Sequence, residues 1–206
     1  MKRVLILSGP TREHIDPVRY LSNASSGKMG KALANEAKSR GFNIDFISGP
    51  VSPENLPDNV NLHPVTGACE MLEKARTLLP NADLIIFAAA VADYMPAEIS
   101  EEKLPKYTEE FTLKLKPTPD IAKTICAEKR ENQITIGFAL QTHDGPTKAR
   151  AKLQRKGLDG IVLNDPSTLD APDGNFSFLG TNAEDFDLWG RISKEECAKR
   201  IFGALG

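Results

Sequence analysis

The sequence has little of several features that mark specialised classes of protein. It contains only three cysteines, Cys69, Cys126 and Cys197, with no CxxC pair, which argues against a disulfide framework or a zinc cage. Its three histidines are scattered, so we expect no metal site built from protein ligands. The 26 basic residues face 28 acidic ones, and this balance favours neither a nucleic acid nor a membrane as partner. The longest apolar run, residues 84–92, is too short to span a bilayer, and with no signal peptide visible we expect a cytoplasmic protein.

Apolar segments alternate along the chain with segments of helical periodicity. Strands are expected at residues 2–8, 42–49, 60–65, 83–90, 110–116, 134–140 and 160–165, and helices at 25–41, 68–79, 119–130, 147–157 and 193–205. This alternation predicts an α/β fold with a Rossmann-like, mainly parallel sheet and helices on both faces. Residues 175–190 predict a small C-terminal hairpin. No linker divides the chain, so we expect a single domain over residues 1–206.

Three polar loops follow predicted strands, at residues 9–25, 88–110 and 140–147. Parallel sheets bind ligands beyond the carboxyl ends of their strands, where the strand order switches direction. The three loops are therefore expected to gather on one rim. The first is unusual, because a strand-to-helix connection normally takes about 2–6 residues.

The first loop ends at a predicted helix start that can attract an anion. It carries neither GxxxxGK(S/T) nor GxGxxG, but Ser25, Ser26 and Gly27 offer free backbone N–H groups in a positive dipole field. Arg19 and Lys28 add positive charge. The alternative is an ordinary helix capped by Ser25 or Ser26, with its basic residues in water.

The second loop follows a buried strand and begins with small residues and Asp93. Loops of this length are usually functional or disordered. Lys103 and Lys106 lie in it and can reach phosphate groups, although solvated lysines on a surface flap are an equally simple interpretation.

The third region joins a strand to a basic helix. Phe138, near the strand end, can stack on a base or simply pack, and Lys152 and Lys156 share one helix face because they are four residues apart. An anion between the two lysines would relieve their repulsion, whereas a solvated face is the commoner alternative.

The order of these motifs is more specific than any one of them. The chain reads GPTREHIDPVRYLSNASSGKMG, then AAAVADYMP with a lysine ten residues after the aspartate, then LKPTPDI, GFAL and KLQRKGLDGIVLND. Over about residues 3–190 it closely resembles the phosphopantothenoylcysteine synthetase family. The resemblance implies a Rossmann-type homodimer whose sites draw on both subunits. It also implies a ligase that joins 4′-phosphopantothenate to cysteine in coenzyme A biosynthesis, with CTP and Mg²⁺, through an acyl-cytidylate.

The resemblance also assigns residues. Asn23 matches the family asparagine that holds the acyl-cytidylate, Arg19 a nearby arginine, and Lys103 the flap lysine that closes over the triphosphate. Catalytic roles are thus expected for Asn23, Lys103 and Arg19. Nucleotide contacts are expected from Asp93, Lys103, Thr118, Pro119, Asp120, Ile121, Phe138, Lys152 and Lys156. Substrate contacts are expected from Arg19, Asn23, Ser25, Ser26, Gly27 and Lys28.

The chain departs from the family pattern at several positions. Leu140 and Gln141 follow GFA where the family often has Ala-Glu, and Pro105 interrupts a flap that is often more basic. No flavin-dependent decarboxylase domain is visible, so we expect a stand-alone synthetase with a separate decarboxylase as a candidate partner.

Two alternatives stay open. One is an NAD(P)-dependent oxidoreductase on the same fold. The sequence lacks both the GxGxxG motif and a suitably placed ribose-binding acid after the second strand, which argues against this alternative. The other is a binding module that retains CTP without turnover.

Overall fold

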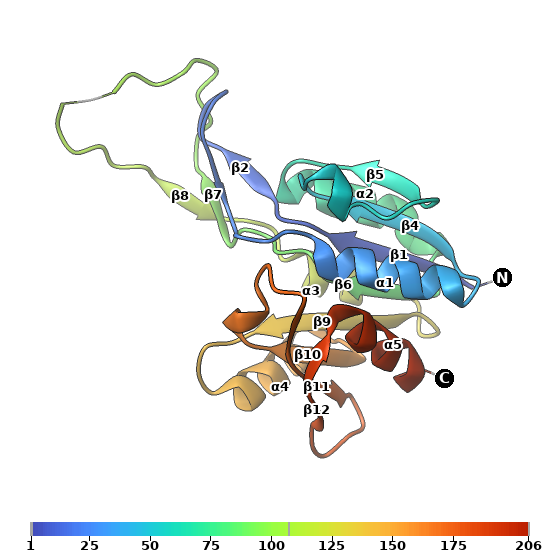
Figure 1. Ribbon diagram of the computed structural model, residues 1–206. Coiled ribbons are helices and arrows are strands. Elements are labelled where there is room, and N and C mark those ends of the chain that lie inside the picture. The colour runs from blue at the N-terminus through green and yellow to red at the C-terminus, as the bar shows by residue number, and fades with distance from the viewer. Residues whose placement is uncertain (1, 107, 206) are drawn as a thin grey trace.

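The computed structural model describes residues 2–106 and 108–205, and its centre is an eight-stranded sheet (Figure 1). The strands of this sheet are β1 (Arg3–Ser8), β4 (Asn43–Ser48), β5 (Asn61–Pro64), β6 (Leu84–Phe87), β9 (Ile134–Leu140), β10 (Gly160–Asn164), β11 (Asp173–Gly180) and β12 (Asp187–Ser193). Their spatial order is β12-β11-β10-β9-β6-β1-β4-β5. The predicted α/β fold with a mainly parallel sheet is confirmed.

The strand order contains a switch point. From β5 to β10 every neighbouring pair is parallel, whereas β11 and β12 pair antiparallel and extend the same sheet. Numbered along the chain, the parallel strands have the order 3-2-1-4-5-6, which reverses direction between β1 and β6. In such sheets the crevice for a ligand opens beyond the carboxyl ends of these two strands.

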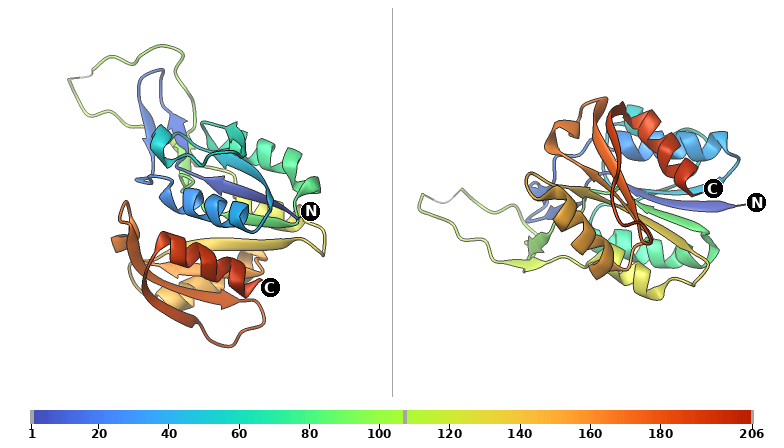
Figure 2. Two further views of the ribbon diagram at one scale, coloured as in Figure 1. Left: turned by 45° about the vertical axis from the view of Figure 1, so that its right-hand side comes forward. Right: turned by 90° about the horizontal axis from the view of Figure 1, so that it is seen from below.

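Helices cover both faces of the sheet. The α-helices are α1 (Lys28–Ser39), α2 (Ala68–Leu78), α3 (Ile121–Glu128), α4 (Gly145–Lys156) and α5 (Lys194–Ala204). The short 3₁₀ helices are η1 (Pro53–Asn55), η2 (Leu79–Asn81) and η3 (Pro166–Thr168). The view from below in Figure 2 shows α1 and α5 on one face of the sheet and α2, α3 and α4 on the other.

The central strand shows why both faces are apolar. Leu5 and Leu7 of β1 pack with α2, whereas Val4 and Ile6 point to the opposite side and pack with α1. All four side chains are buried, as expected for a parallel strand with helices above and below it.

Two short antiparallel pairs were not anticipated from the sequence. Strands β2 (Arg12–His14) and β3 (Tyr20–Ser22) form one pair, and β7 (Tyr94–Pro96) and β8 (Leu115–Pro117) form the other. The two pairs lie side by side, and the loop from β7 to β8 projects far from the sheet (Figures 1 and 2). The strand expected at 110–116 is correspondingly reduced to Leu115–Pro117, because the preceding residues run along this projection.

Helix caps differ from expectation in two places. Helix α1 begins after Gly27, which has a left-handed backbone (φ 79°), and no side chain caps it, so the expected cap by Ser25 or Ser26 is wrong. Helix α3 begins after Asp120, whose side chain accepts a hydrogen bond from the N–H of Lys123; Pro119 therefore precedes the helix. Helix α5 begins after Ser193, whose side-chain oxygen accepts a hydrogen bond from the N–H of Glu196 at 3.1 Å. Within residues 2–106 and 108–205, no helix has the length and apolar character needed to cross a bilayer.

Candidate active site

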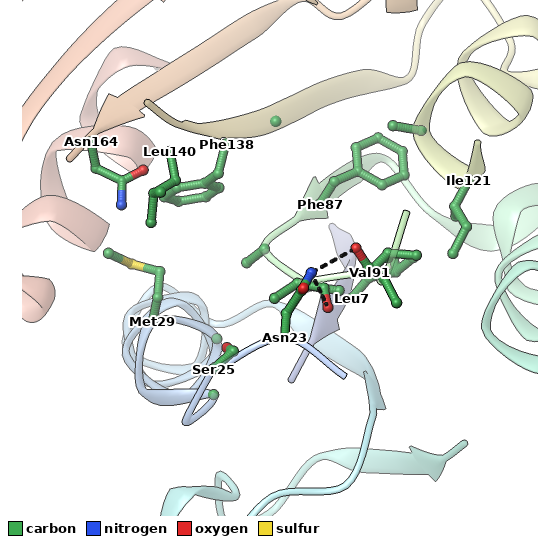
Figure 3. Close-up of a pocket in the computed structure, with 18 of the residues that line it drawn as sticks. Leu7, Asn23, Ser25, Met29, Phe87, Val91, Ile121, Phe138, Leu140 and Asn164 are labelled. Carbon is green, nitrogen blue, oxygen red and sulfur yellow. Dashed lines mark hydrogen bonds between the residues drawn. The ribbon is translucent and has the colours of Figure 1, made fainter. Parts of the chain in front are cut away.

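A cleft of about 830 Å³ opens at the switch point, in the size range of small-molecule sites (Figure 3). Its base is formed by the ends of β1 and β6, at Leu7 and Phe87, and by Phe138 of β9. One wall comes from the N-terminus of α1 and the loop before it, and the other from the segments that follow β6 and β8.

Most of the residues expected to form a site line this cleft. The expected residues found there are Asn23, Ser25, Ser26, Gly27, Lys28, Asp93, Thr118, Pro119, Asp120, Ile121, Phe138, Lys152 and Lys156. Arg19 and Lys103 are not among its lining residues. Lining residues that the sequence did not single out include Asn164, Asp170 and Lys194.

Asn23 ties the first loop to the segment after β6. Its side-chain N–H group donates to the carbonyl oxygen of Val91 at 2.9 Å, with a longer contact of 3.5 Å to that of Ala90 (Figure 3). These bonds need an amide donor, which an aspartate in the same place would lack. Asn23 therefore joins the two walls of the cleft at the switch point.

Two threonines fix the backbone that leads to Asp93. The N–H of Ala92 donates to the hydroxyl of Thr11 at 3.0 Å, and the hydroxyl of Thr118 donates to the carbonyl of Ala92 at 2.5 Å. The N–H of Thr118 also donates to the carbonyl of Asp93 at 3.0 Å. The exposed carboxylate of Asp93 thus stands on a rigid backbone at the cleft wall.

The start of α1 lies very close to the end of β1. A Cβ atom added to Gly30 would lie 1.9 Å from the hydroxyl oxygen of Ser8, so only glycine permits this approach. With Ser25 and Gly27, Gly30 forms the pattern SxGxxG. Its last two glycines take the positions that serve phosphate approach and helix–strand packing in the GxGxxG fingerprint. A search that required the first glycine could not find it.

Lys152 and Lys156 extend from α4 into the cleft. Burial, followed by the nearby charge of Lys156, lowers the pKa of Lys152 to about 8, and its ammonium group donates to the carbonyl of Phe138 at 2.7 Å. Lys156 lies 3.0 Å from the carboxylate of Asp120. Burial alone would raise the pKa of Asp120, but bonds from the N–H of Lys123 and from Lys156 outweigh it and leave that pKa low. This end of the cleft therefore holds two cations against one carboxylate.

Arg19 and Lys103 belong instead to the base of the projecting loop. The buried carboxylate of Asp16 accepts bonds from the guanidinium of Arg19 and, at 3.1 Å, from the N–H of Leu104. Arg19 also donates to the carbonyl of Leu104 at 2.9 Å. The bond from Arg19, despite the opposing effect of burial, holds the pKa of Asp16 far below its usual range. The backbone of Leu104, next to Lys103, is thus held beside the first loop, and Lys103 does not line the cleft of its own chain.

The cleft contains carboxylates but no ready-made metal cage. Asp93, Asp120 and Asp170 all line it, and the latter two form ion pairs with lysines. Across the part of the chain that the structure describes, no group of three or more His, Cys, Asp or Glu side chains is placed to hold a metal ion.

A switch-point cleft bordered by a helix N-terminus defines a Rossmann-like α/β protein. The family follows from the sequence. Residues 1–205 match the family described as "DNA/pantothenate metabolism flavoprotein C-terminal domain", and the chain belongs to that family.

Individual relatives agree with this assignment. The chain is 46% identical over 168 residues to the "Coenzyme A biosynthesis bifunctional protein CoaBC" of Vibrio vulnificus, covering 81% of this chain and 42% of that protein. The crystal structure of the C-terminal domain of a CoaBC protein superposes with a TM-score of 0.83 at 34% identity, covering 99% of this chain and 93% of that one. A Cab2 mutant in complex with phosphopantothenate-cysteine shares the fold alone, with a TM-score of 0.80 at 16% identity, covering 98% and 86%. The chain spans less than half the length of the first curated relatives, 45% and 42%.

Proposed function

We propose that this chain is a single-domain ligase of coenzyme A biosynthesis that joins 4′-phosphopantothenate to cysteine with CTP as co-substrate. The observation that carries the proposal is that Asn23, Asp93 and Lys156, which come from two loops and helix α4 far apart in the sequence, line one switch-point cleft. Membership of the family, and a relative named for coenzyme A biosynthesis, support this chemistry.

The proposed reaction has two steps. A carboxylate oxygen of 4′-phosphopantothenate attacks the α-phosphorus of CTP, and the bond to the β-phosphate breaks and releases pyrophosphate. The cysteine amine then attacks the acyl carbon, the acyl–phosphate bond breaks with loss of CMP, and the amine proton passes to solvent. A carboxylate is already nucleophilic, so the first step needs positioning and charge neutralisation rather than a strong base.

This division of labour fits the cleft. Lys28, Lys152 and Lys156 supply positive charge for phosphates, and Asn23, which can donate and accept, holds the acyl-cytidylate. Asp93 accepts hydrogen bonds from the ribose or base, since a carboxylate beside a triphosphate would be repelled. The 118–121 backbone and Phe138 complete the nucleotide contacts. When bound with the nucleotide, Mg²⁺ would supply further charge neutralisation, and its ligands would be mainly phosphate oxygens and water, since the described residues form no metal cage.

Because Arg19 and Lys103 do not line the cleft of their own chain, their proposed roles require a second copy of the chain. They stand at the base of a projection whose apolar side chains Val18, Tyr94 and Ile99 are more than half exposed. A homodimer would cover these side chains and bring both cations to the partner's cleft. Analytical ultracentrifugation tests the homodimer, because it would sediment with the mass of two chains. A separate phosphopantothenoylcysteine decarboxylase is the further proposed partner.

The test of the ligase is pyrophosphate release with CTP, Mg²⁺, 4′-phosphopantothenate and cysteine. Asn23→Asp removes the donor to Val91 and is expected to lower turnover by about 10²-fold or more and to accumulate or release the cytidylate. Lys103→Ala is expected to slow cytidylate formation. Lys31→Ala is the matched control, because Lys31 is a half-buried residue of α1 that does not line the cleft and whose ammonium group donates to the backbone carbonyl oxygen of Glu54. Absence of pyrophosphate with both CTP and ATP would refute the ligase, and unchanged rates in both site variants would refute these roles.

A further inference from the structure

An acidic side chain occupies the cationic corner of the cleft beside α1. The ammonium group of Lys28 lies 2.6 Å from a carboxylate oxygen of Asp170 and 2.8 Å from the carbonyl oxygen of the same residue. The bond from Lys28, and then a bond from the Ser26 hydroxyl, lower the pKa of Asp170. Both Lys28 and Ser26 line the cleft, so Asp170 is bonded to groups that face the ligand space.

The backbone of the segment that carries Asp170 is held by hydrogen bonds from Lys194 of α5 and by a cap at η3. The buried ammonium group of Lys194 donates to the carbonyl oxygens of Thr168 and Ala171, on either side of it. Asp165 caps η3 by accepting from the N–H of Ser167 at 2.8 Å. The backbone around Asp170 is therefore held, whereas its side chain is 77% exposed. Rotation of that side chain alone can carry the carboxylate away from Lys28 without moving the segment.

The ammonium groups of Lys28 and Lys194 and the carboxylate of Asp170 all line this corner of the cleft. Burial, and then repulsion by the charge of Lys28, lower the pKa of Lys194, whereas the charge of Asp170 opposes this effect. Asp170 offsets that repulsion in the unliganded protein. An exposed ion pair is weak. A polyphosphate, which carries several charges and can bond Lys28, Ser26 and the free N–H groups of α1 together, is suited to displace it.

We propose that Asp170 is an internal competitor for the anion site at the start of α1, and that a polyphosphate group binds there by displacing its carboxylate from Lys28. The inference deepens the proposed function, since it concerns the same cleft. It does not depend on turnover, because displacement is a binding event.

The test is calorimetric binding of sodium tripolyphosphate to the full chain at neutral pH and low ionic strength, in EDTA and again with Mg²⁺. Asp170→Asn is expected to bind about three- to five-fold more tightly than the wild type, the factor lost to an exposed ion pair. Asp173→Asn, which removes the partner of Arg191 outside the cleft, is the matched control and is expected to bind as the wild type does.

A double-mutant comparison distinguishes displacement of the Asp170 carboxylate from Lys28 from a general electrostatic repulsion between Asp170 and the ligand. In a Lys28→Gln background the gain from Asp170→Asn is expected to vanish, because no pair remains to be broken. An equal gain in that background, no gain in the wild-type background, or weaker binding of Asp170→Asn with Mg²⁺ present would each overturn the proposal; the last result would make Asp170 a metal ligand. Inactivity of the ligase leaves these binding measurements interpretable.

Discussion

Replacing Gly30 by alanine tests the close approach of α1 to β1 on which the cleft depends. The new Cβ would lie 1.9 Å from the hydroxyl oxygen and 2.4 Å from the Cβ of Ser8, which is itself buried. Rotation of the Ser8 side chain removes the first overlap but not the second. The backbone of α1 must therefore retreat from the strand end, and Gly27 and Lys28 move with it.

The free energy of unfolding is expected to fall by a net amount of about 2 kcal/mol. Overpacking costs about 3 kcal/mol, at the upper end of the usual range because backbone must shift, and alanine regains about 1 kcal/mol of helix propensity. Urea unfolding at equilibrium measures this difference. Calorimetric titration with CTP is expected to show weaker binding, since the N–H groups at the helix start are displaced from the cleft.

Gly203→Ala in α5 is the matched control. Nothing lies within 4 Å of a Cβ at that position, so the same substitution is expected to stabilise the protein by about 0.5–1 kcal/mol and to leave CTP binding unchanged. If Gly30→Ala is as stable as the wild type and binds CTP equally well, the helix start does not depend on this approach and the reasoning is wrong.

Two further predictions concern pH. Burial would raise the pKa of Asp45, but bonds from Arg3 and His63 outweigh it and lower that pKa, so the carboxylate stabilises the folded state above about pH 4 and this contribution is lost as pH falls below it. Asp45→Asn is expected to lose about 1–3 kcal/mol at neutral pH and to show a flatter acid limb in urea unfolding; an unchanged limb contradicts this. Lys152, with a pKa lowered to about 8, loses its charge as pH rises through that value, so CTP affinity is expected to fall there in the wild type. Lys152→Met should bind about 10-fold more weakly at neutral pH and lack this step, and a step that persists in the variant counts against Lys152 as its source.

The main architecture could be predicted because its signal is periodic and apolar. The apolar run at 84–87 indicates a strand buried on both faces, and the helical periodicity of apolar residues along α1 indicates a helix packed on one side. Together such segments predict a parallel sheet with helices on both faces. Pairs such as β2–β3 could not be found this way, because strands of three residues at the surface carry no pattern. The predicted C-terminal hairpin is present as β11 and β12, whereas the pairing of β11 with β10, which adds the hairpin to the main sheet, was not predicted.

The candidate site was predictable where a family motif carried it and less so elsewhere. Asn23 and Asp93 were found as motif positions, and the fold brings both to the cleft. Asp170 and Lys194 were missed because each pairs with a residue distant in sequence, Lys28 in one case and the carbonyl of Thr168 in the other. The contact of Arg19 with the base of the projecting loop is likewise a product of tertiary structure.

The most direct measurement is a crystal structure of the Asn23→Asp variant soaked with CTP, Mg²⁺ and 4′-phosphopantothenate. We predict density for the cytidine nucleotide between the start of α1 and Phe138, with its α-phosphorus bonded to the carboxylate oxygen of the acid, as in the acyl-cytidylate, beside residue 23. A nucleotide bound elsewhere, or a cleft that stays empty at saturating CTP while the protein remains folded, would contradict the claim that the switch point is where this protein works.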